Sequence, residues 1–144
     1  MLNLIVGTVL ASVSFLGFNS NSTLLDVTNR FNSPVSVENT ETTNYQKFVY
    51  LRDAYAAIAV CDNKGKLYEL SAVGLNKSVN YKGVRLCDTF KNVIVKMGNP
   101  DSFQIDEDHV IVNYKDVSFN LAKYRKNVYQ VFSIEVKFNQ NTMK

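Results

Sequence analysis

The sequence predicts an α+β protein made of two tandem α-β-β-β repeats that form one continuous antiparallel sheet, with two helices packed on one face. Three observations support this fold class. Residues 12–34 match residues 78–100 at a constant offset. The chain has 8 tyrosines and 9 phenylalanines but only two prolines and six glycines, and this composition favours strands. Both matching segments also have the apolar spacing of a short helix.

The internal match keeps one register over its whole length, without a gap. Conservative pairs such as Phe15 with Tyr81 and Arg30 with Lys96 fall in that register. A second copy of one structural unit is the simplest explanation. The identical pairs are Ser12 and Ser78, Val13 and Val79, Gly17 and Gly83, Thr23 and Thr89, Val27 and Val93, and Pro34 and Pro100.

Length and composition are those of one globular domain. The 144 residues suffice to bury a core, and 46% apolar with 20% charged residues excludes a disordered chain. We expect a single domain over residues 1–138, with repeat 1 at about 4–73 and repeat 2 at about 74–138, followed by a flexible tail at 139–144. The net charge of +3 is too small to indicate nucleic-acid binding by itself.

The segment from Met1 to Leu25 carries no charged side chain and has two interpretations. A signal or anchor over residues 1–18 would need a basic region before its apolar stretch, and none is present. Val6–Gly7 instead aligns with Val73–Gly74 when one gap is allowed, which favours a folded strand. The sequence therefore favours a cytoplasmic protein, with export or membrane anchoring as the alternative.

Each repeat opens with a predicted helix, over Ser22–Pro34 and again over the equivalent residues 88–100. Ser22 and Asp88 are expected as N-caps, because their side chains can accept hydrogen bonds from the first turn. Asn32 and Gly98 occupy the stop positions, since these residue types tolerate a left-handed backbone. The apolar positions that form one face of each helix are Leu24, Val27 and Phe31 in the first copy, and Phe90, Val93, Ile94 and Met97 in the second.

An antiparallel meander is expected after each helix. Alternation such as that of Val117, Phe119 and Leu121 with polar neighbours indicates a half-buried strand. Together the strands predict one sheet of six to eight strands. The expected strands are Lys47–Leu51, Tyr55–Val60 and Leu67–Val73 in the first repeat, and Val110–Tyr114, Val117–Leu121 and Val128–Phe138 in the second.

No catalytic, cofactor or metal site is expected. The single histidine, His109, follows Asp106 and Asp108 in a segment typical of a solvated acidic turn, and no nucleophile motif accompanies it. The segment lacks the glycine turn of a calcium loop. Cys61 and Cys87 have no metal-ligand spacing, and we expect free thiols in preference to a disulfide. The sequence therefore predicts a protein that is not an enzyme.

Basic residues interleaved with tyrosines in the second half are the candidate partner-binding site. This pattern suits an acidic protein surface, because Tyr and Arg are enriched at interface hot spots. It also suits phosphate contacts with base stacking, and it is equally typical of solvated hairpin turns. The candidate residues are Tyr114, Lys115, Lys123, Tyr124, Arg125, Lys126 and Tyr129, together with Tyr50 and Arg52.

The unit "SVxYxGVxLxDTFxxVxxxMGNP" resembles the helix-opening motif of the β-lactamase inhibitory protein fold. The outer-membrane assembly lipoproteins have a related single unit. The resemblance implies a tandem duplication of a helix-plus-strands unit and a sheet that can bind another protein. Cys61 and Cys87 do not match the disulfide within each repeat that is typical of the inhibitors, and no lipidated cysteine lies near residue 1.

These features favour a non-enzymatic inhibitor or neutralising module that binds a protein target through an open sheet face and its loops. The composition fits a small bacterial or phage accessory protein of the anti-defence or immunity type. One alternative is an envelope-associated structural protein with an N-terminal anchor. A second is a weak nucleic-acid-binding protein that uses the basic residues of the second half.

Overall fold

The computed structural model describes residues 13–42 and 44–138. Each half contains a short hairpin, one helix and four strands, in that order. The first half comprises β1 (Ser14–Phe15), β2 (Phe18–Asn19), α2 (Leu24–Phe31), β3 (Ser36–Asn39), β4 (Tyr45–Leu51), β5 (Tyr55–Asp62) and β6 (Leu67–Gly74). The second comprises β7 (Asn80–Tyr81), β8 (Val84–Arg85), α3 (Phe90–Met97), β9 (Ser102–Ile105), β10 (His109–Asn113), β11 (Val117–Arg125) and β12 (Val128–Lys137).

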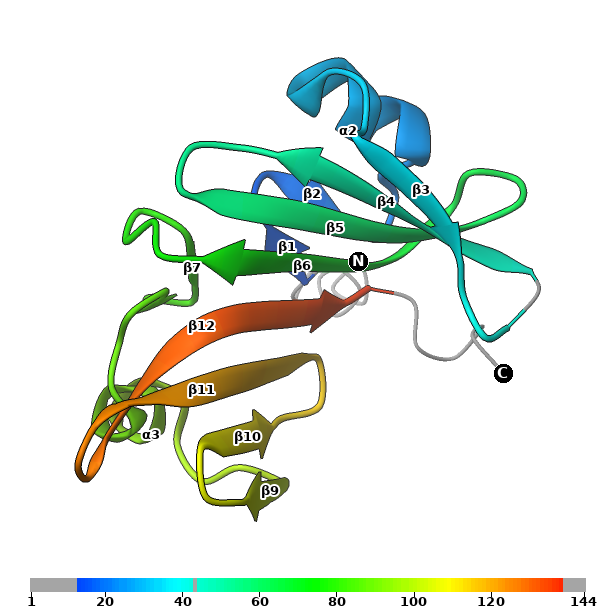
Figure 1. Cartoon of the computed structure of the whole chain (residues 1–144). Coiled ribbons are helices and arrows are strands. Elements are labelled where there is room, and N and C mark those ends of the chain that lie inside the picture. The colour runs from blue at the N-terminus through cyan, green and yellow to red at the C-terminus, as the bar shows by residue number, and fades with distance from the viewer. Residues whose placement is uncertain (1–12, 43, 139–144) are drawn as a thin grey trace, which may run out of the picture.

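One eight-stranded sheet runs through both halves, in the order β3-β4-β5-β6-β12-β11-β10-β9 (Figure 1). Every neighbouring pair is antiparallel. The halves join at the centre, where β6 pairs with β12 and Leu70 lies opposite Val136. The predicted single continuous sheet is therefore confirmed.

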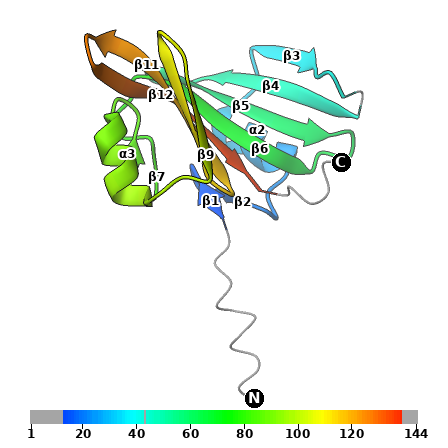
Figure 2. The ribbon, with the colours of Figure 1, turned by 90° about the horizontal axis from the view of Figure 1, so that it is seen from below.

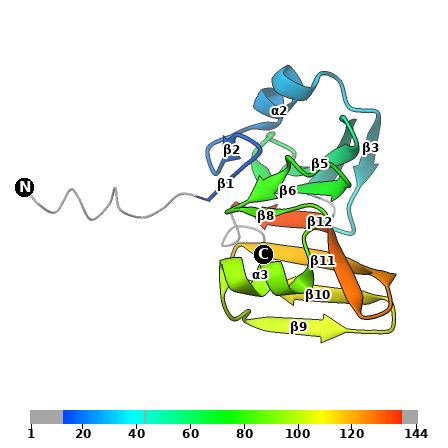
Figure 3. The same ribbon diagram turned by 90° about the vertical axis from the view of Figure 1, so that its left-hand side faces the viewer.

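Both helices and both short hairpins lie on the same side of the sheet (Figures 2 and 3). Val27 of α2 and Val93 of α3 are fully buried in one shared core with the facing sheet residues. The α+β class with two helices on one sheet face is thus the architecture that the sequence predicted. Among the described residues, no helix covers the other face of the sheet.

The core follows the two-residue period of the strands. One cross-strand row joins Ala59, Leu70, Val136 and Val117 from four adjacent strands, and all four side chains are buried beneath the helices. Side chains one position away in each strand point to the opposite face. The register therefore fixes which residues remain available outside the core.

Each helix begins one residue later than the sequence suggested. Thr23 and Thr89 are the N-caps, and each side chain accepts from the backbone N–H three residues ahead. The expected caps Ser22 and Asp88 are wrong, because their side chains cap the preceding turn instead. Ser22 Oγ accepts the Asn19 N–H at 2.9 Å, and the Asp88 carboxylate accepts the N–H three residues before it at 2.8 Å.

The helix ends confirm the predicted stops. Asn32 and Gly98 have φ of 69° and 83°, the left-handed region that Asn and Gly tolerate best. Pro34 and Pro100 follow two residues later. The helices themselves are shorter than expected, eight residues each, because the capped turns at either end are not helical.

The sequence did not reveal the two short hairpins before the helices. Their two-residue turns, Leu16–Gly17 and Lys82–Gly83, have positive φ at both positions. Positive φ at both central residues is typical of the type I′ turn, which matches the twist of a tight hairpin. This turn explains why glycine recurs at the same place in the two matching segments.

The edge strands β3 and β9 were not among the strands expected from the sequence. Both strands have four residues, which is too few to show the alternation of apolar and polar side chains that identifies a longer strand. The six strands predicted from alternation are all present, with shifted ends. The largest shift is in β11, which continues to Arg125 where a connecting loop was expected to begin after Leu121.

The two halves have the same order of elements, and the offset found in the sequence relates their starts from β1 and β7 through β3 and β9. Duplication of one ancestral unit stays a prediction. The opening strand proposed around Val6–Gly7, the first twelve residues of the alternative signal over 1–18, and the tail at 139–144 lie outside the described residues. The last residues of that 1–18 span belong to the β1–β2 hairpin. No helix in the described part of the chain is long and apolar enough to cross a membrane.

Candidate interaction surface

The sheet face that no helix of the described residues covers is a candidate interaction surface (Figure 3), and we call it the open face. One row crosses all eight strands on this face and defines it. The row follows the registered pairs from edge to edge: Ser36, Val49, Ile58, Ser71, Glu135, Ser118, Asn113 and Ser102.

On the second half of the open face, polar side chains form a hydrogen-bonded network. Ser118 Oγ and Asn113 Oδ1 lie 2.8 Å apart, and Asn113 Nδ2 donates to Ser102 Oγ at 3.2 Å. Asn120 Nδ2 donates to Glu135 at 3.1 Å. Buried polar groups need such partners to offset their desolvation. The network therefore holds these side chains in fixed positions.

The first half of the open face is more apolar. Ile58 and Val49 lie opposite each other in the defining row. The rings of Tyr45 and Tyr68 meet edge to face with their centroids 5.0 Å apart. With Val60 they form a second, smaller buried cluster. The open face thus combines an apolar half with a polar half, a composition found in protein interfaces.

Two carboxylates lie close together at the centre of the open face. Glu69 lies opposite Lys137, and Glu135 lies two residues before Lys137 on β12. Partial burial raises the pKa of Glu69, and the neighbouring Glu135 raises it further, whereas Lys137 and Lys47 lower it. A cation or donor from a partner would relieve this unfavourable pair.

Four of the predicted partner-binding residues lie together at the tip of the β11–β12 hairpin, where these two strands of the sheet end. All four side chains are exposed to solvent. Tyr129 follows them on β12, half-buried, and its hydroxyl donates to the Glu107 carbonyl at 3.3 Å. The tip residues are Lys123, Tyr124, Arg125 and Lys126.

The other predicted residues are not part of that group. Tyr50 is fully buried in the core, where its hydroxyl lies 2.9 Å from Thr28 Oγ1, so its proposed contact with a partner is wrong. Arg52 is exposed on the helix side, and its guanidinium lies 4.6 Å from the centre of the Phe31 ring. Tyr114 is half-buried on the same side, where it packs on Phe119 and donates to the Gly98 carbonyl at 2.8 Å.

Lys115 lies exposed in the turn between β10 and β11. Strand register explains why the sequence grouped residues that the fold separates. Whether a tyrosine on a strand points inward depends on its partner strands, and the sequence did not reveal those partners.

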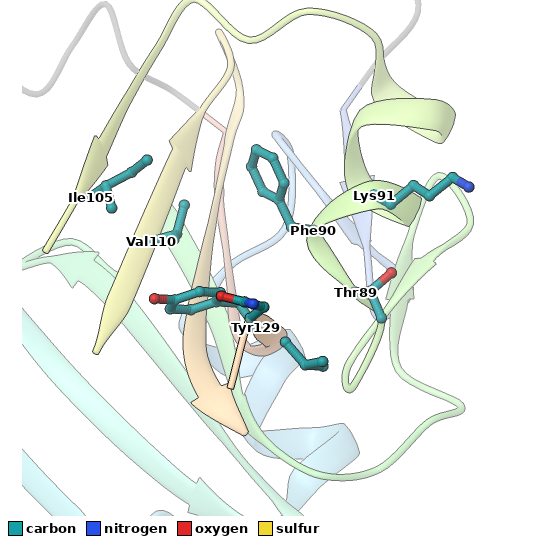
Figure 4. A pocket seen from close by; sticks show the side chains of 8 residues that line it. Thr89, Phe90, Lys91, Ile105, Val110 and Tyr129 are labelled. Atoms are coloured by element: carbon teal, nitrogen blue, oxygen red, sulfur yellow. The ribbon is translucent and has the colours of Figure 1, made fainter. Parts of the chain in front are cut away.

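A second concave site lies on the helix side of the second half (Figure 4). It is a mainly apolar pocket of about 460 Å³ between the start of α3, strands β9 and β10, and the β11–β12 hairpin. No pattern in the sequence indicates this pocket. The residues that line it are Thr89, Phe90, Lys91, Ile105, Val110, Asn127, Val128 and Tyr129.

The different hairpin lengths of the two halves account for this pocket. In the first half the β5–β6 turn reaches the helix directly, and the Leu24 N–H donates to Gly65 O at 2.8 Å. The equivalent contact in the second half is the bridge between Thr89 and Gln130, the third residue of β12. The β11–β12 hairpin therefore extends beyond the helix start, and its end forms one wall of the pocket.

The remaining chemical groups do not form a reactive cluster. His109 Nδ1 lies 3.7 Å from Asp106 Oδ1, and both side chains are exposed in the acidic turn. Cys61 and Cys87 are free thiols, one buried and one half-buried. Within residues 13–42 and 44–138, no group of three His, Cys, Asp or Glu side chains could hold a metal ion.

No family model and no curated protein sequence matches this chain. Solved structures with a similar fold include a cysteine-rich secretory protein from Staphylococcus aureus subsp. aureus Mu50, with a TM-score of 0.61, 12% identity, and coverage of 90% of this chain and 48% of that chain. An extracellular protein containing an SCP domain from Bacillus anthracis str. Ames gives a TM-score of 0.60, 10% identity, and coverage of 84% and 44%.

A third similar structure is a DUF4309 family protein from Bacillus subtilis subsp. subtilis str. 168, with a TM-score of 0.54 and 13% identity. The match covers 81% of this chain and 78% of that one. The chain spans about half the length of the first two proteins. At these identities the likeness shows an α+β fold dominated by sheet. None of the three is a β-lactamase inhibitory protein.

Proposed function

We propose that the chain is a non-enzymatic module that binds a protein partner, and inhibits or neutralises it, through the open face and the β11–β12 hairpin tip. This proposal rests on one observation: both helices of the described residues pack on the same face of the sheet and leave the other face open (Figure 3). The eight strands support a surface with two parts. Hydrogen bonds hold the polar side chains of its second half in place, and its first half is more apolar. A prepared surface of this kind binds with little ordering cost.

The hairpin tip adds exposed Tyr and Arg side chains, the residue types enriched at binding hot spots. The resemblance to the β-lactamase inhibitory protein fold supports the same function, because it implies a sheet that binds another protein. A role as a phage or bacterial accessory protein of the anti-defence or immunity type belongs to this proposal.

Two observations bear on the cellular compartment of the protein, and they point in opposite directions. Two free cysteines suit a reducing cytoplasm, whereas two structural neighbours are described as secretory or extracellular proteins. We propose a cytoplasmic location, and fractionation of the native host tests it against export.

Binding through the open face predicts that two apolar positions are essential. Ile58 on β5 and Ile111 on β10 lie half-buried on this face, and a lysine at either position would place a charge within the interface. We expect wild-type protein to capture a protein from host extract in stoichiometric amount at physiological salt, and each lysine variant to lose at least about tenfold of that binding.

The matched control is Val95→Lys, which adds the same charge at an exposed position of α3 on the helix side. Val95→Lys should bind the captured protein as the wild type does. The proposal would be wrong if no protein is retained, or if both open-face variants bind the captured protein as tightly as the control does.

A further inference from the structure

We propose a second binding site at the β9 edge of the sheet, which accepts an extended protein segment as a ninth strand. The segment carries apolar side chains at alternate positions and basic residues at its ends. This site is separate from the open face, because the side chains that form it lie on the helix side. It therefore goes beyond the function proposed above.

The backbone of β9 offers unpaired groups along its outer edge. Asp106 N–H donates to His109 O at 3.0 Å, so these two residues form a hydrogen-bonded pair of the β9–β10 ladder. Bonded and non-bonded pairs alternate along an antiparallel ladder. Phe103 and Ile105 therefore direct their N–H and C=O groups away from β10. Such free edges are templates for an added strand.

The side chains of β9 extend the core face beyond the cover of α3. Phe103 lies opposite Val112 and Ile105 opposite Val110, and both partners are buried core residues. Phe103 and Ile105 are nevertheless 51% and 63% exposed. Large apolar side chains next to a core and open to solvent indicate a surface that is covered in a complex.

The apolar pocket lies directly beside this edge. Ile105 and Val110 form one wall and Phe90 lies across from them, with the Tyr129 ring at the base (Figure 4). A volume of about 460 Å³ is within the range that binds a large side chain or a small ligand. A segment paired with β9 would place alternate side chains on the helix side, next to Ile105 and the pocket mouth.

Charge at the two ends of β9 determines which segment fits. Asp101 precedes the strand and Asp106 follows it, and both are exposed. Hydrogen bonds from the Asp108 and His109 N–H groups lower the pKa of Asp106, which keeps it ionised. Glu107 and Asp108 continue the acidic turn. Lys91, which points away from the pocket in Figure 4, and the hairpin-tip cations lie on other elements across the pocket.

A second copy of the chain fits poorly at this edge. Antiparallel pairing of two β9 strands through these outward groups places Phe103 of each copy opposite Ile105 of the other, and therefore Asp101 of each copy opposite Glu107 of the other. Like charges that lie opposite each other destabilise a strand pair. A segment with Lys or Arg at both ends gains attraction at the same two places. Basic flanks therefore distinguish the proposed segment from a second copy.

The opposite edge of the sheet provides a matched control. Thr40 N–H donates to Tyr45 O at 3.3 Å, so the same alternation directs the N–H groups of Val37 and Asn39 outward from β3. Asn39 occupies the place of Ile105 when the two halves are aligned at their common offset. The hollow beside Asn39 is lined mainly by polar side chains, so it offers no apolar site for a bound segment.

The test is a surface-display library of eight-residue segments with Val, Ile, Leu, Phe or Tyr at alternate positions and Lys, Arg, Asp, Glu, Ser or Thr at the others. Ile105→Pro removes one outward N–H without removing a ladder bond, because proline is tolerated on an edge strand at such a position. Asn39→Pro makes the same change on β3. We expect selected segments to carry Lys or Arg at their ends and to bind Ile105→Pro at least about tenfold more weakly.

The same segments should bind Asn39→Pro, Ile58→Lys and Ile111→Lys within twofold of wild type, and should weaken on Asp101→Lys. Circular dichroism checks that every variant is folded. Failure to enrich any segment, enrichment of acidic ends, or equal binding to Ile105→Pro would overturn the proposal. So would a wild-type dimer in sedimentation that Ile105→Pro dissociates, because the occupant would then be a second copy.

Discussion

Several residues repeat their roles between the two halves, although their side chains differ. The Arg30 Nη1 donates to the Leu16 carbonyl, and the Lys96 Nζ donates to the Gly83 carbonyl, both at 2.7 Å. Each basic residue lies in the last turn of its helix and links that helix to the preceding hairpin. The fold therefore needs a cationic hydrogen-bond donor at this position, and either Arg or Lys can supply it.

Asp88 shows how a local network holds such a junction together. Burial by itself raises the pKa of this carboxyl, but the Arg85 N–H, the Lys96 ammonium and Asn92 together outweigh burial and lower it. The carboxylate lies 3.2 Å from Lys96 Nζ. Asp88 was predicted as the N-cap of the helix, and the structure instead assigns its carboxylate to the turn before the helix.

The two cysteines should differ sharply in reactivity. Burial, and then the charge of Asp62, raise the pKa of Cys61 to about 12, and its side chain is fully buried. The thiolate is the reactive form, so Cys61 should stay unmodified at pH 8. Iodoacetamide should add one group to the native protein, at Cys87, and two in guanidinium chloride, as measured by mass spectrometry.

The Cys87→Ser variant is the control and should gain no group while folded. Modification of Cys61 in native Cys87→Ser, at a rate similar to that in guanidinium chloride, would contradict its buried position. Such a result would also place β5 differently in the sheet.

At the scale of elements, periodic strands and capped helices were predictable, and very short strands were not. Six strands with alternation were predicted, whereas β3 and β9 gave no signal because four residues are too few to show a period. Each helix cap was predicted one residue too early. In the first half, Ser22 and Thr23 are both good capping residues. Only the hydrogen-bond geometry distinguishes them.

The candidate site was predicted in part for the same reason. The hairpin-tip residues are exposed, and a cluster of Lys, Arg and Tyr can be recognised from composition alone as a solvent-facing segment. Tyr50 was misplaced and the pocket was missed, because both depend on which strands pair and how far a hairpin extends. These are tertiary features that local sequence does not contain.

The two hairpin turns predict different costs for the same substitution. Gly17 and Gly83 have φ of 86° and 88°, so alanine is strained at both. A Cβ at Gly17 would also collide with the Arg30 guanidinium, whereas one at Gly83 would meet Lys96 Cδ at an ordinary 3.9 Å. We expect Gly83→Ala to lower the free energy of unfolding by about 1 kcal/mol and Gly17→Ala by about 2 kcal/mol.

Urea denaturation of the two variants measures this difference. Equal losses would show that the Arg30 contact with the hairpin contributes nothing to stability. A gain in stability for either variant would contradict the positive φ of the turns.

At the scale of the whole molecule, one sheet runs through the β6–β12 pair, and we expect the two halves to unfold as a single cooperative unit for this reason. Val27, Val93 and Ile134 belong to one core that includes both helices and the centre of the sheet. The sequence predicted this continuity, as one sheet of six to eight strands. Continuity across the centre is also what keeps the open face in one piece.

Native-state hydrogen exchange measured by NMR tests this central claim most directly. Amides of β6 and β12, including those of Leu70 and Val136, should exchange slowest and open with one free energy shared by the cores of both halves. Fast exchange in β6 and β12, with two different opening free energies for the halves, would contradict a single sheet and the open face built on it.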